Sequence, residues 1–335
     1  MKVLASCIGA MTLIVGIVIV SARQGAWETD PTEAQALYGA PPSQFLDVDG
    51  TRLHYRDEGQ GPVLVLLHGS RGSLHQWDGW VRELGAKFRI VRVDAMAHGL
   101  SGADGRDDYS TERRHFLLNS LLAHLQVERF ILGGTSSGAS EAVRYTVANP
   151  GRVEKLLLST IPLRLPAQAR TSRSDRAVFW FHDHILGTLA TDWYWRRFLR
   201  SVYGDPDKVS PELAHRYRML NSLPGQQQRF LRRLAIWRSD NVAEGDFKRA
   251  AQITVPTFIQ WGGAGPVLPR EMFCEISSAF TQTAAQVKVY PQLGHMLVME
   301  DPVQTARDAL AFIDGSTVGS ACSARSAASV APVSR

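Results

Sequence analysis

Two residues that lie far apart in the sequence have the types that nucleophilic catalysis requires. Ser136 is the centre of Gly134-Thr135-Ser136-Ser137-Gly138, and His295 follows Leu293-Gly294 near the end of the chain. A serine hydroxyl becomes a nucleophile when a neighbouring base such as histidine accepts its proton. The two residues therefore predict a nucleophile and its base, if the fold brings them together.

The residues around the pentapeptide favour this interpretation over a plain glycine-rich turn. An apolar run at 130–132 precedes it, and a helical pattern at 139–148 follows it. A sharp turn from a strand into a helix requires glycine at the flanking positions and lifts the serine hydroxyl clear of the sheet. Ser137 is the poorer nucleophile candidate, because no glycine lies two residues before it.

The rest of the core predicts a sheet that can position this turn. Two alternating segments, 45–49 and 51–55, flank Asp49-Gly50 and are typical of a β-hairpin. Apolar runs without alternation are typical of buried parallel strands, and helical patterns such as 111–125 lie between them. These runs are 63–67, 88–93, 130–132, 156–158, 255–260 and 287–290. The alternation predicts an α/β fold with a doubly wound, mostly parallel sheet.

Residues 161–246 interrupt this rhythm and read as a helical lid inserted between two strands. Helical patterns cover 178–185, 192–203, 211–220 and 226–237, and no strand run occurs. Its aromatic residues either form an apolar pocket wall or pack the insertion onto the sheet; they are Trp180, Phe181, Trp193, Tyr194, Trp195 and Trp237. Arginines outnumber acidic residues here. They could favour an anionic substrate, contact anionic lipid headgroups, or simply be solvated.

The N-terminal segment is apolar and uncharged from residue 3 to residue 20. It predicts a transmembrane anchor or, alternatively, a signal peptide cleaved near Val20-Ser21-Ala22, with a buried helix as the third interpretation. Either of the first two places the catalytic domain outside the cytoplasm, anchored to the membrane or secreted.

The predicted organisation is one catalytic domain with additions. Residues 1–22 are the anchor or signal segment, 23–44 a tether, 45–160 and 247–313 the core, 161–246 the lid and 314–335 a disordered tail. A formal charge of +5 without basic motifs argues against a nucleic-acid partner. Three scattered cysteines are too few for a metal cluster or a disulfide framework, and no cofactor is implied.

The chain from about 45 to 313 resembles the α/β-hydrolase family, in its lid-containing, serine-nucleophile form. Besides the pentapeptide, His68-Gly69-Ser70 is similar to the family's loop after the third strand. The resemblance implies that the backbone N–H groups of Ser70 and Ser137 form an oxyanion hole, and that His295 is the catalytic histidine.

Two further stretches carry the same resemblance. Residues 94–101 are similar to the family's D-x-P-G-H-G-x-S stretch, although Met96 and Ala97 replace its proline and glycine. We expect Asp94 and His98 to be structural and Trp77 to pack in the core.

The sequence departs from the family where the catalytic acid is expected. The family's W-G-x-x-D pattern has Trp261-Gly262-Gly263-Ala264-Gly265 here, so a glycine holds the acid position. The preceding core strand ends Leu158-Ser159-Thr160 and offers no carboxylate. Replacements are candidates by elimination only: Asp183, Asp192, Asp240, Glu271 and Glu300.

The predicted function is a serine hydrolase that cleaves an ester-like carbonyl substrate, preferably an apolar one, through an acyl-enzyme and is weakened by the missing acid. The acid stabilises the imidazolium, and its loss commonly costs about 10⁴-fold in turnover. The alternatives are a binding protein that has lost turnover and a carbon–carbon bond hydrolase. Epoxide hydrolysis would need a carboxylate where Ser136 stands.

Overall fold

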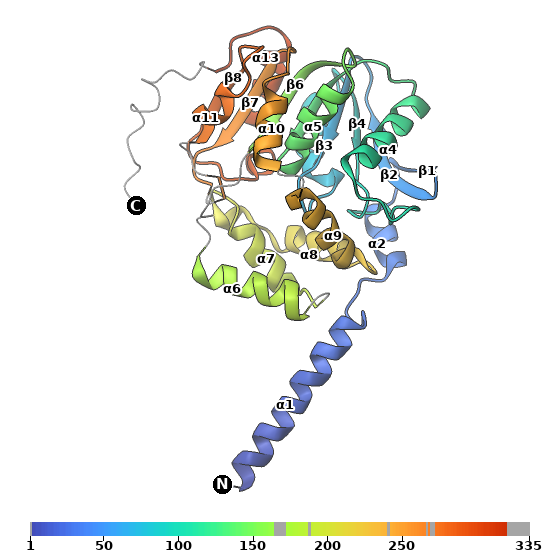
Figure 1. Cartoon of the computed structure of the whole chain (residues 1–335), viewed down its shortest axis with the longest axis vertical. Coiled ribbons are helices and arrows are strands. Elements are labelled where there is room, and N and C mark those ends of the chain that lie inside the picture. The colour runs from blue at the N-terminus through green and yellow to red at the C-terminus, as the bar shows by residue number, and fades with distance from the viewer. Residues whose placement is uncertain are drawn as a thin grey trace.

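The computed structural model describes residues 2–163, 172–186, 189–239, 242–265, 267–268 and 272–319. Its centre is an eight-stranded sheet in the order β1-β2-β4-β3-β5-β6-β7-β8 (Figure 1). The first two pairings, β1 with β2 and β2 with β4, are antiparallel, and the others are parallel. The strands are β1 (Ser43–Val48), β2 (Thr51–Glu58), β3 (Val63–Leu67), β4 (Arg89–Val93), β5 (Phe130–Thr135), β6 (Val153–Ser159), β7 (Thr257–Gly262) and β8 (Gln286–Tyr290).

Helices cover both faces of the sheet. In the core they are α3 (Asp78–Leu84), α4 (Thr111–His124), α5 (Ser137–Ala148), α10 (Val242–Ala250), α11 (Met272–Ser278), α12 (Leu297–Glu300) and α13 (Pro302–Ile313). Successive side chains of a strand point to opposite faces. Leu64 and Leu66 therefore pack with α3 and α13, whereas Val65 and Leu67 pack with α4 and α5. The predicted doubly wound sheet is confirmed, and its central strand β3 is apolar throughout because both of its faces are buried.

Between β6 and α10, where the sequence predicts the insertion, the described residues form four α-helices. They are α6 (Arg173–Phe181), which continues into the short π-helix His182–Leu186, α7 (Asp192–Arg200), α8 (Pro211–Asn221) and α9 (Gln226–Ser239). Figure 1 shows them gathered at one end of the sheet, on the side from which α1 projects. Tyr194, Trp195 and Tyr217 form a separate apolar cluster between these helices.

The segment predicted as a tether is packed rather than loose. Helix α2 (Pro31–Tyr38) buries Ala34 completely. Thr29 donates its backbone N–H to Ser222 O at 2.7 Å, and Glu28 accepts from Gly225 N at 3.0 Å. These contacts hold residues 28–38 against the insertion.

Helix α1 (Lys2–Arg23) projects from the body as a single rod (Figure 1). None of the helices, over the residues described, combines the length and hydropathy needed to cross a membrane. The structure therefore does not support the predicted transmembrane anchor; the side chains of residues 1–9 lie outside its described part.

The C-terminal segment differs in part from the predicted disordered tail. Val318 donates its backbone N–H to the Gln286 side chain at 2.9 Å, so residues up to 319 run beside β8. Residues 320–335 lie outside the described part. Cys274 on α11 is disulfide-bonded, a feature that the sequence did not predict.

Candidate active site

Ser136 occupies a strained turn between β5 and α5. Its φ of 53° and ψ of −125° lie outside the regions that an L-residue ordinarily adopts. Such a conformation costs on the order of 1–3 kcal/mol and persists only where the surroundings impose it.

The two glycines of the pentapeptide make this turn sterically feasible. A Cβ on Gly134 would lie 2.4 Å from Gly138 O, and one on Gly138 would lie 2.4 Å from Leu67 O. The sharp turn that the sequence predicts is therefore confirmed, and its glycines are required by backbone contacts on both sides.

His295 reaches the serine from the loop that follows β8. Its Nε2 lies 2.9 Å from Ser136 Oγ, within hydrogen-bond distance. Two hydrogen bonds fix the backbone of His295. Its N–H donates to Val202 O at 2.8 Å, and its carbonyl accepts from Thr160 Oγ1 at 3.0 Å. The fold thus brings the two predicted residues together.

Glu300 positions the loop that carries His295. Its buried carboxylate accepts from Gly294 N at 2.9 Å and from Gly204 N at 2.8 Å. A Cβ on Gly294 would lie 2.2 Å from Gly204 N, so the two segments touch backbone to backbone. Glu300 therefore serves the histidine loop without contacting the imidazole Nδ1 as an acid would.

The imidazole has no acid partner in the part of the chain that the structure describes. Nδ1 of His295 is buried and no described atom lies within hydrogen-bond distance of it. Gly265 faces the same loop: an added Cβ there would lie 3.2 Å from His295 N. Burial without a compensating charge lowers the pKa of His295 to about 4. The imidazole is consequently neutral at pH 7 and weakly basic.

The predicted replacement acids are engaged elsewhere or lie outside the described residues. Asp183 accepts from Arg71 at 2.9 Å and from Gln227 at 3.1 Å, and Asp192 accepts from Arg218 at 2.6 Å. Asp240 and Glu271 fall among the residues that are not described. None of the three described candidates takes the place of the missing carboxylate.

The two predicted oxyanion residues lie next to each other beside the serine. Ser70 Oγ donates to Ser137 Oγ at 3.0 Å. Ser137 begins α5, where the first backbone N–H groups have no partner within the helix. A Cβ on Gly69 would lie 3.0 Å from Ser136 Cβ, so the loop passes directly over the nucleophile candidate. This placement suits donors for an oxyanion that forms on a carbonyl bound at Ser136.

Asp94 ties the surrounding loops together, as the sequence predicts. One oxygen accepts from Leu74 N at 2.6 Å, and the other lies 2.7 Å from His54 Nδ1 and accepts from Leu100 N at 2.8 Å. His68 completes the support, because its Nδ1–H donates to Gly69 O at 2.8 Å and its Nε2 accepts from Ala95 N at 2.9 Å.

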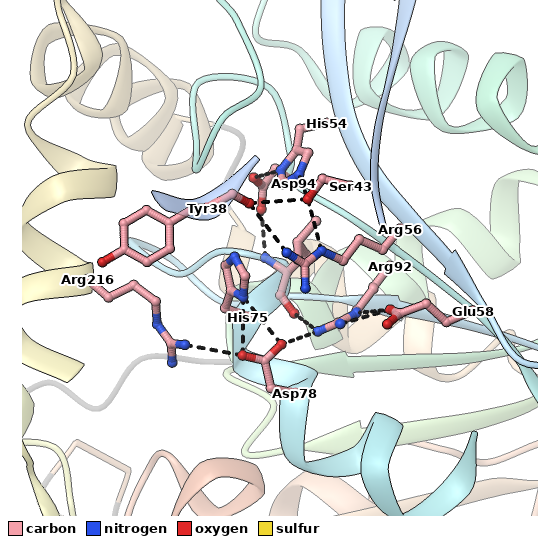
Figure 2. A network of polar contacts seen from close by, with 11 residues as sticks. Tyr38, Ser43, His54, Arg56, Glu58, His75, Asp78, Arg92, Asp94 and Arg216 are labelled. Carbon is pink, nitrogen blue, oxygen red and sulfur yellow. Dashed lines mark hydrogen bonds and ion pairs between the residues drawn. The ribbon is translucent and has the colours of Figure 1, made fainter. Parts of the chain in front are cut away.

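Figure 2 shows how this network extends outward from His54 and Asp94. Asp78 on α3 contacts both Arg92 and His75, and it also accepts from Arg216 at 3.2 Å. Arg216 belongs to α8, so an ion pair links the insertion to the core beneath the active-site loops.

A cavity of about 190 Å³ opens at Ser136 and His295. Its walls are mostly apolar, and α9 supplies one side of it. The lining residues are Ser70, Ser136, Ser137, Pro162, Phe230, Arg233, Leu234, Val267, Leu268 and His295.

Of the two interpretations of the insertion's aromatic residues, the pocket wall is not borne out by those whose side chains are described, since none of them lines the cavity. Tyr194 and Trp195 pack inside the insertion, while Trp180, Phe181 and Trp193 are exposed. The side chain of Trp237 lies outside the described part. Sequence reasoning missed Phe230 and Leu234, which lie four residues apart on one face of α9. Only that helical spacing could have indicated them.

No cluster of metal-ligating side chains occurs among the described residues.

Comparison with known proteins places the chain in a family. A family model for the alpha/beta hydrolase fold matches residues 62–302. The chain is 24% identical over 297 residues to the 2-hydroxy-6-oxononadienedioate/2-hydroxy-6-oxononatrienedioate hydrolase of Paraburkholderia xenovorans, covering 84% of this chain and 99% of that protein. It is 27% identical over 288 residues to a soluble epoxide hydrolase of a Corynebacterium species, covering 79% and 94%. A solved membrane phospholipase A, 21% identical, superposes with a TM-score of 0.65 over 94% of this chain and 96% of that one, a likeness of fold alone.

Proposed function

The chain belongs to the α/β-hydrolase fold family, and hydrolases are among its relatives; we propose that it is a serine hydrolase that cleaves an ester-like carbonyl substrate through an acyl-enzyme. The observation that carries the proposal is the 2.9 Å contact between Ser136 Oγ and His295 Nε2 at the mouth of an apolar cavity.

The reaction begins when Ser136 Oγ attacks the carbonyl carbon and His295 Nε2 accepts the hydroxyl proton. The carbonyl oxygen becomes an oxyanion next to the N–H groups of Ser70 and Ser137. When the tetrahedral intermediate collapses, the bond to the leaving group breaks and the imidazolium returns the proton to it. Water then attacks the acyl-enzyme with His295 again as the base, which releases the acid and frees Ser136.

The helices α6 to α9 act as a lid in this proposal. Phe230 and Leu234 of α9 line the cavity over Ser136, so this helix excludes water and contacts the substrate. The lone Nδ1 of His295 makes the enzyme slow, because no described carboxylate stabilises the imidazolium.

A fluorophosphonate probe tests the proposal, because it reacts only with an activated serine. We expect labelling of the wild-type protein and none of Ser136→Ala. The matched control is Ser140→Ala, one turn further along α5, where the buried hydroxyl has no hydrogen-bond partner among the described residues; it should label like the wild type. A folded wild-type protein that resists the probe would contradict the proposal.

Two alternatives rest on particular observations. The unpartnered Nδ1 of His295 favours a binding protein that has lost turnover. A folded wild-type protein that the fluorophosphonate probe does not label would support this alternative. The similarity to a 2-hydroxy-6-oxononadienedioate hydrolase favours carbon–carbon bond cleavage, which the disappearance of the dienoate absorbance of such a substrate would reveal. Epoxide hydrolysis is disfavoured by Ser136, since that chemistry would need a carboxylate nucleophile there.

We also propose that the catalytic domain works outside the cytoplasm, held to the membrane by α1 or secreted after its removal. The disulfide at Cys274 supports this location, because disulfides persist mainly in oxidising compartments. The exposed apolar side chains of α1, such as Leu13 and Ile17, support a role for that helix in targeting. Alkylation of thiols in intact cells, combined with the N-terminal sequence of the mature protein, tests it: a free Cys274 in the cytoplasmic fraction would contradict the proposal.

A further inference from the structure

The guanidinium of Arg233 borders the active-site cavity and makes no direct ion pair with a described residue. Five arginines whose side chains are nearly buried each pair with a carboxylate within about 3 Å. The pairs are Arg71 with Asp183, Arg92 with Glu58, Arg113 with Asp104, Arg114 with Glu141 and Arg144 with Asp246. Arg233 on α9 makes no ion pair with any residue that the structure describes.

The partner of Arg233 is a neutral histidine. Nη1 of Arg233 lies 3.1 Å from His98 Nε2 and 3.2 Å from its Nδ1, and Nδ1 in turn lies 3.2 Å from Met96 O. His98 therefore donates from Nδ1 and accepts at Nε2. Burial and the nearby Arg233 charge hold the pKa of His98 well below its ordinary value, so the imidazole brings no negative charge. Burial also lowers the pKa of Arg233 to about 10, which still leaves it charged at neutral pH.

The charge of Arg233 borders the space in which a substrate would bind. Glu141 acts on it electrostatically, but that carboxylate pairs with Arg114 and His115. Arg233 lines the cavity that contains Ser136 and His295, and it also lines a smaller cavity of about 60 Å³ beside it. A guanidinium carries five N–H donors in a planar fork, and His98 occupies one side of it. No described residue accepts a hydrogen bond from the other donors of Arg233, and a carboxylate matches two such donors with parallel hydrogen bonds.

We propose that Arg233 binds a carboxylate of the substrate, so that the enzyme prefers esters or related carbonyl compounds that carry a second, anionic group. The apolar part of such a substrate lies against Phe230, Leu234 and Leu268, and its carbonyl lies at Ser136. This inference rests on the proposed hydrolase function and specifies its substrate class.

The chain offers a matched control on the same helix. Arg232 is the neighbouring residue, but its guanidinium is exposed and pairs with Asp107 at 2.7 Å. Arg233→Met and Arg232→Met each remove one positive charge from α9, and only the first removes it from the cavity.

Kinetics with two p-nitrophenyl esters tests the preference: one of glutaric acid with a free terminal carboxylate, and one of pentanoic acid, which has the same chain length. We expect the ratio of kcat/KM, acidic ester over neutral ester, to be at least about 10 in the wild type. It should fall by about that factor in Arg233→Met, stay unchanged in Arg232→Met and be partly kept in Arg233→Lys. An equal fall in both methionine variants, or a wild-type ratio near 1, would overturn the inference.

Binding without turnover separates this inference from the proposed function. Titration calorimetry with the Ser136→Ala variant should show that monomethyl glutarate, which carries a free carboxylate, binds at least about tenfold more tightly than neutral dimethyl glutarate. Adding Arg233→Met should abolish that difference, whereas adding Arg232→Met should keep it. If this preference holds while no ester is cleaved, the hydrolase proposal fails and the anion site stands; if esters are cleaved without it, the anion site fails alone. Circular dichroism checks that each variant is folded.

Discussion

Restoring a carboxylate at position 265 should accelerate the enzyme. The φ of Gly265 is not in the left-handed region, and the closest contacts of an added Cβ are 3.2 Å to His295 N and 3.4 Å to Gly294 C. An aspartate therefore requires shifts of only a few tenths of an ångström. Its carboxylate would extend from a Cβ that lies against the backbone of His295, whose Nδ1 has no described partner.

The size of the gain follows from the electrostatics of His295. Burial lowers its pKa from 6.5 to about 4. A carboxylate that offsets this burial would stabilise the imidazolium by about 3 kcal/mol, since one pKa unit corresponds to about 1.4 kcal/mol. The imidazolium forms as Ser136 attacks, so Gly265→Asp should raise kcat/KM by up to about 300-fold. The effect stays below the factor commonly lost with the acid, because a new carboxylate is also desolvated.

The assay is hydrolysis of a neutral p-nitrophenyl ester as a function of pH. Gly265→Asp should raise the plateau and move the acidic limb of kcat/KM from about pH 4 towards pH 6.5. Gly265→Asn is the matched control, because it has the same size without the charge and should do neither. A folded Asp variant with an unchanged rate and profile, or an Asn variant that gains as much, would refute this reasoning and point to an acid among the residues not described.

Three further predictions follow from the same contacts. In the wild type, kcat/KM should fall only as the pH drops through about 4, because protonated His295 cannot accept the serine proton; a limb near pH 6.5 would contradict the burial effect. Gly138→Ala should lower the free energy of unfolding in urea by about 1–3 kcal/mol, since its Cβ would meet Leu67 O at 2.4 Å; Gly102→Ala, with no contact under 3.7 Å, should change it by less than about 0.5 kcal/mol. Glu300→Gln loses one of the acceptors that hold Gly294 and Gly204 and should cost about 1–3 kcal/mol in the same measurement, whereas the exposed Glu112→Gln should cost almost nothing.

The fold was predictable where a short stretch of sequence is compatible with only one local structure. Asp49 and Gly50 both have positive φ, and the hairpin β1–β2 turns at them as the sequence indicates. The strand β3, buried on both faces, is an unbroken apolar run and spans the predicted residues 63–67. The helices α10 and α11 were missed, because each is short and their apolar residues do not repeat clearly at a helical period.

The site was predictable in its reacting pair and not in its walls. A serine at a strand-to-helix turn and a histidine after a late strand have fixed places in a parallel sheet, so their meeting follows from topology. The cavity wall depends on how α9 is rotated, and periodicity alone does not say which face of the insertion meets the sheet. For the same reason, the sequence does not predict which of two neighbouring arginines pairs with a carboxylate and which lines the cavity. The fold places Arg232 beside Asp107 and Arg233 against the cavity.

The structural cost of the turn at Ser136 argues for turnover over passive binding. The positive φ of Ser136 and the buried His295, whose Nδ1 has no described partner, both subtract from stability. A pocket that only binds a ligand needs neither of them, because any small residue in a relaxed turn would line it equally well. The arrangement becomes useful only if Oγ of Ser136 must stand clear of the sheet with a proton acceptor 2.9 Å away. Replacing Ser136 with glycine should therefore relax the turn and raise the free energy of unfolding by about 1 kcal/mol or more while abolishing probe labelling; a variant less stable than the wild type would mean that the strain is compensated by contacts of the side chain itself.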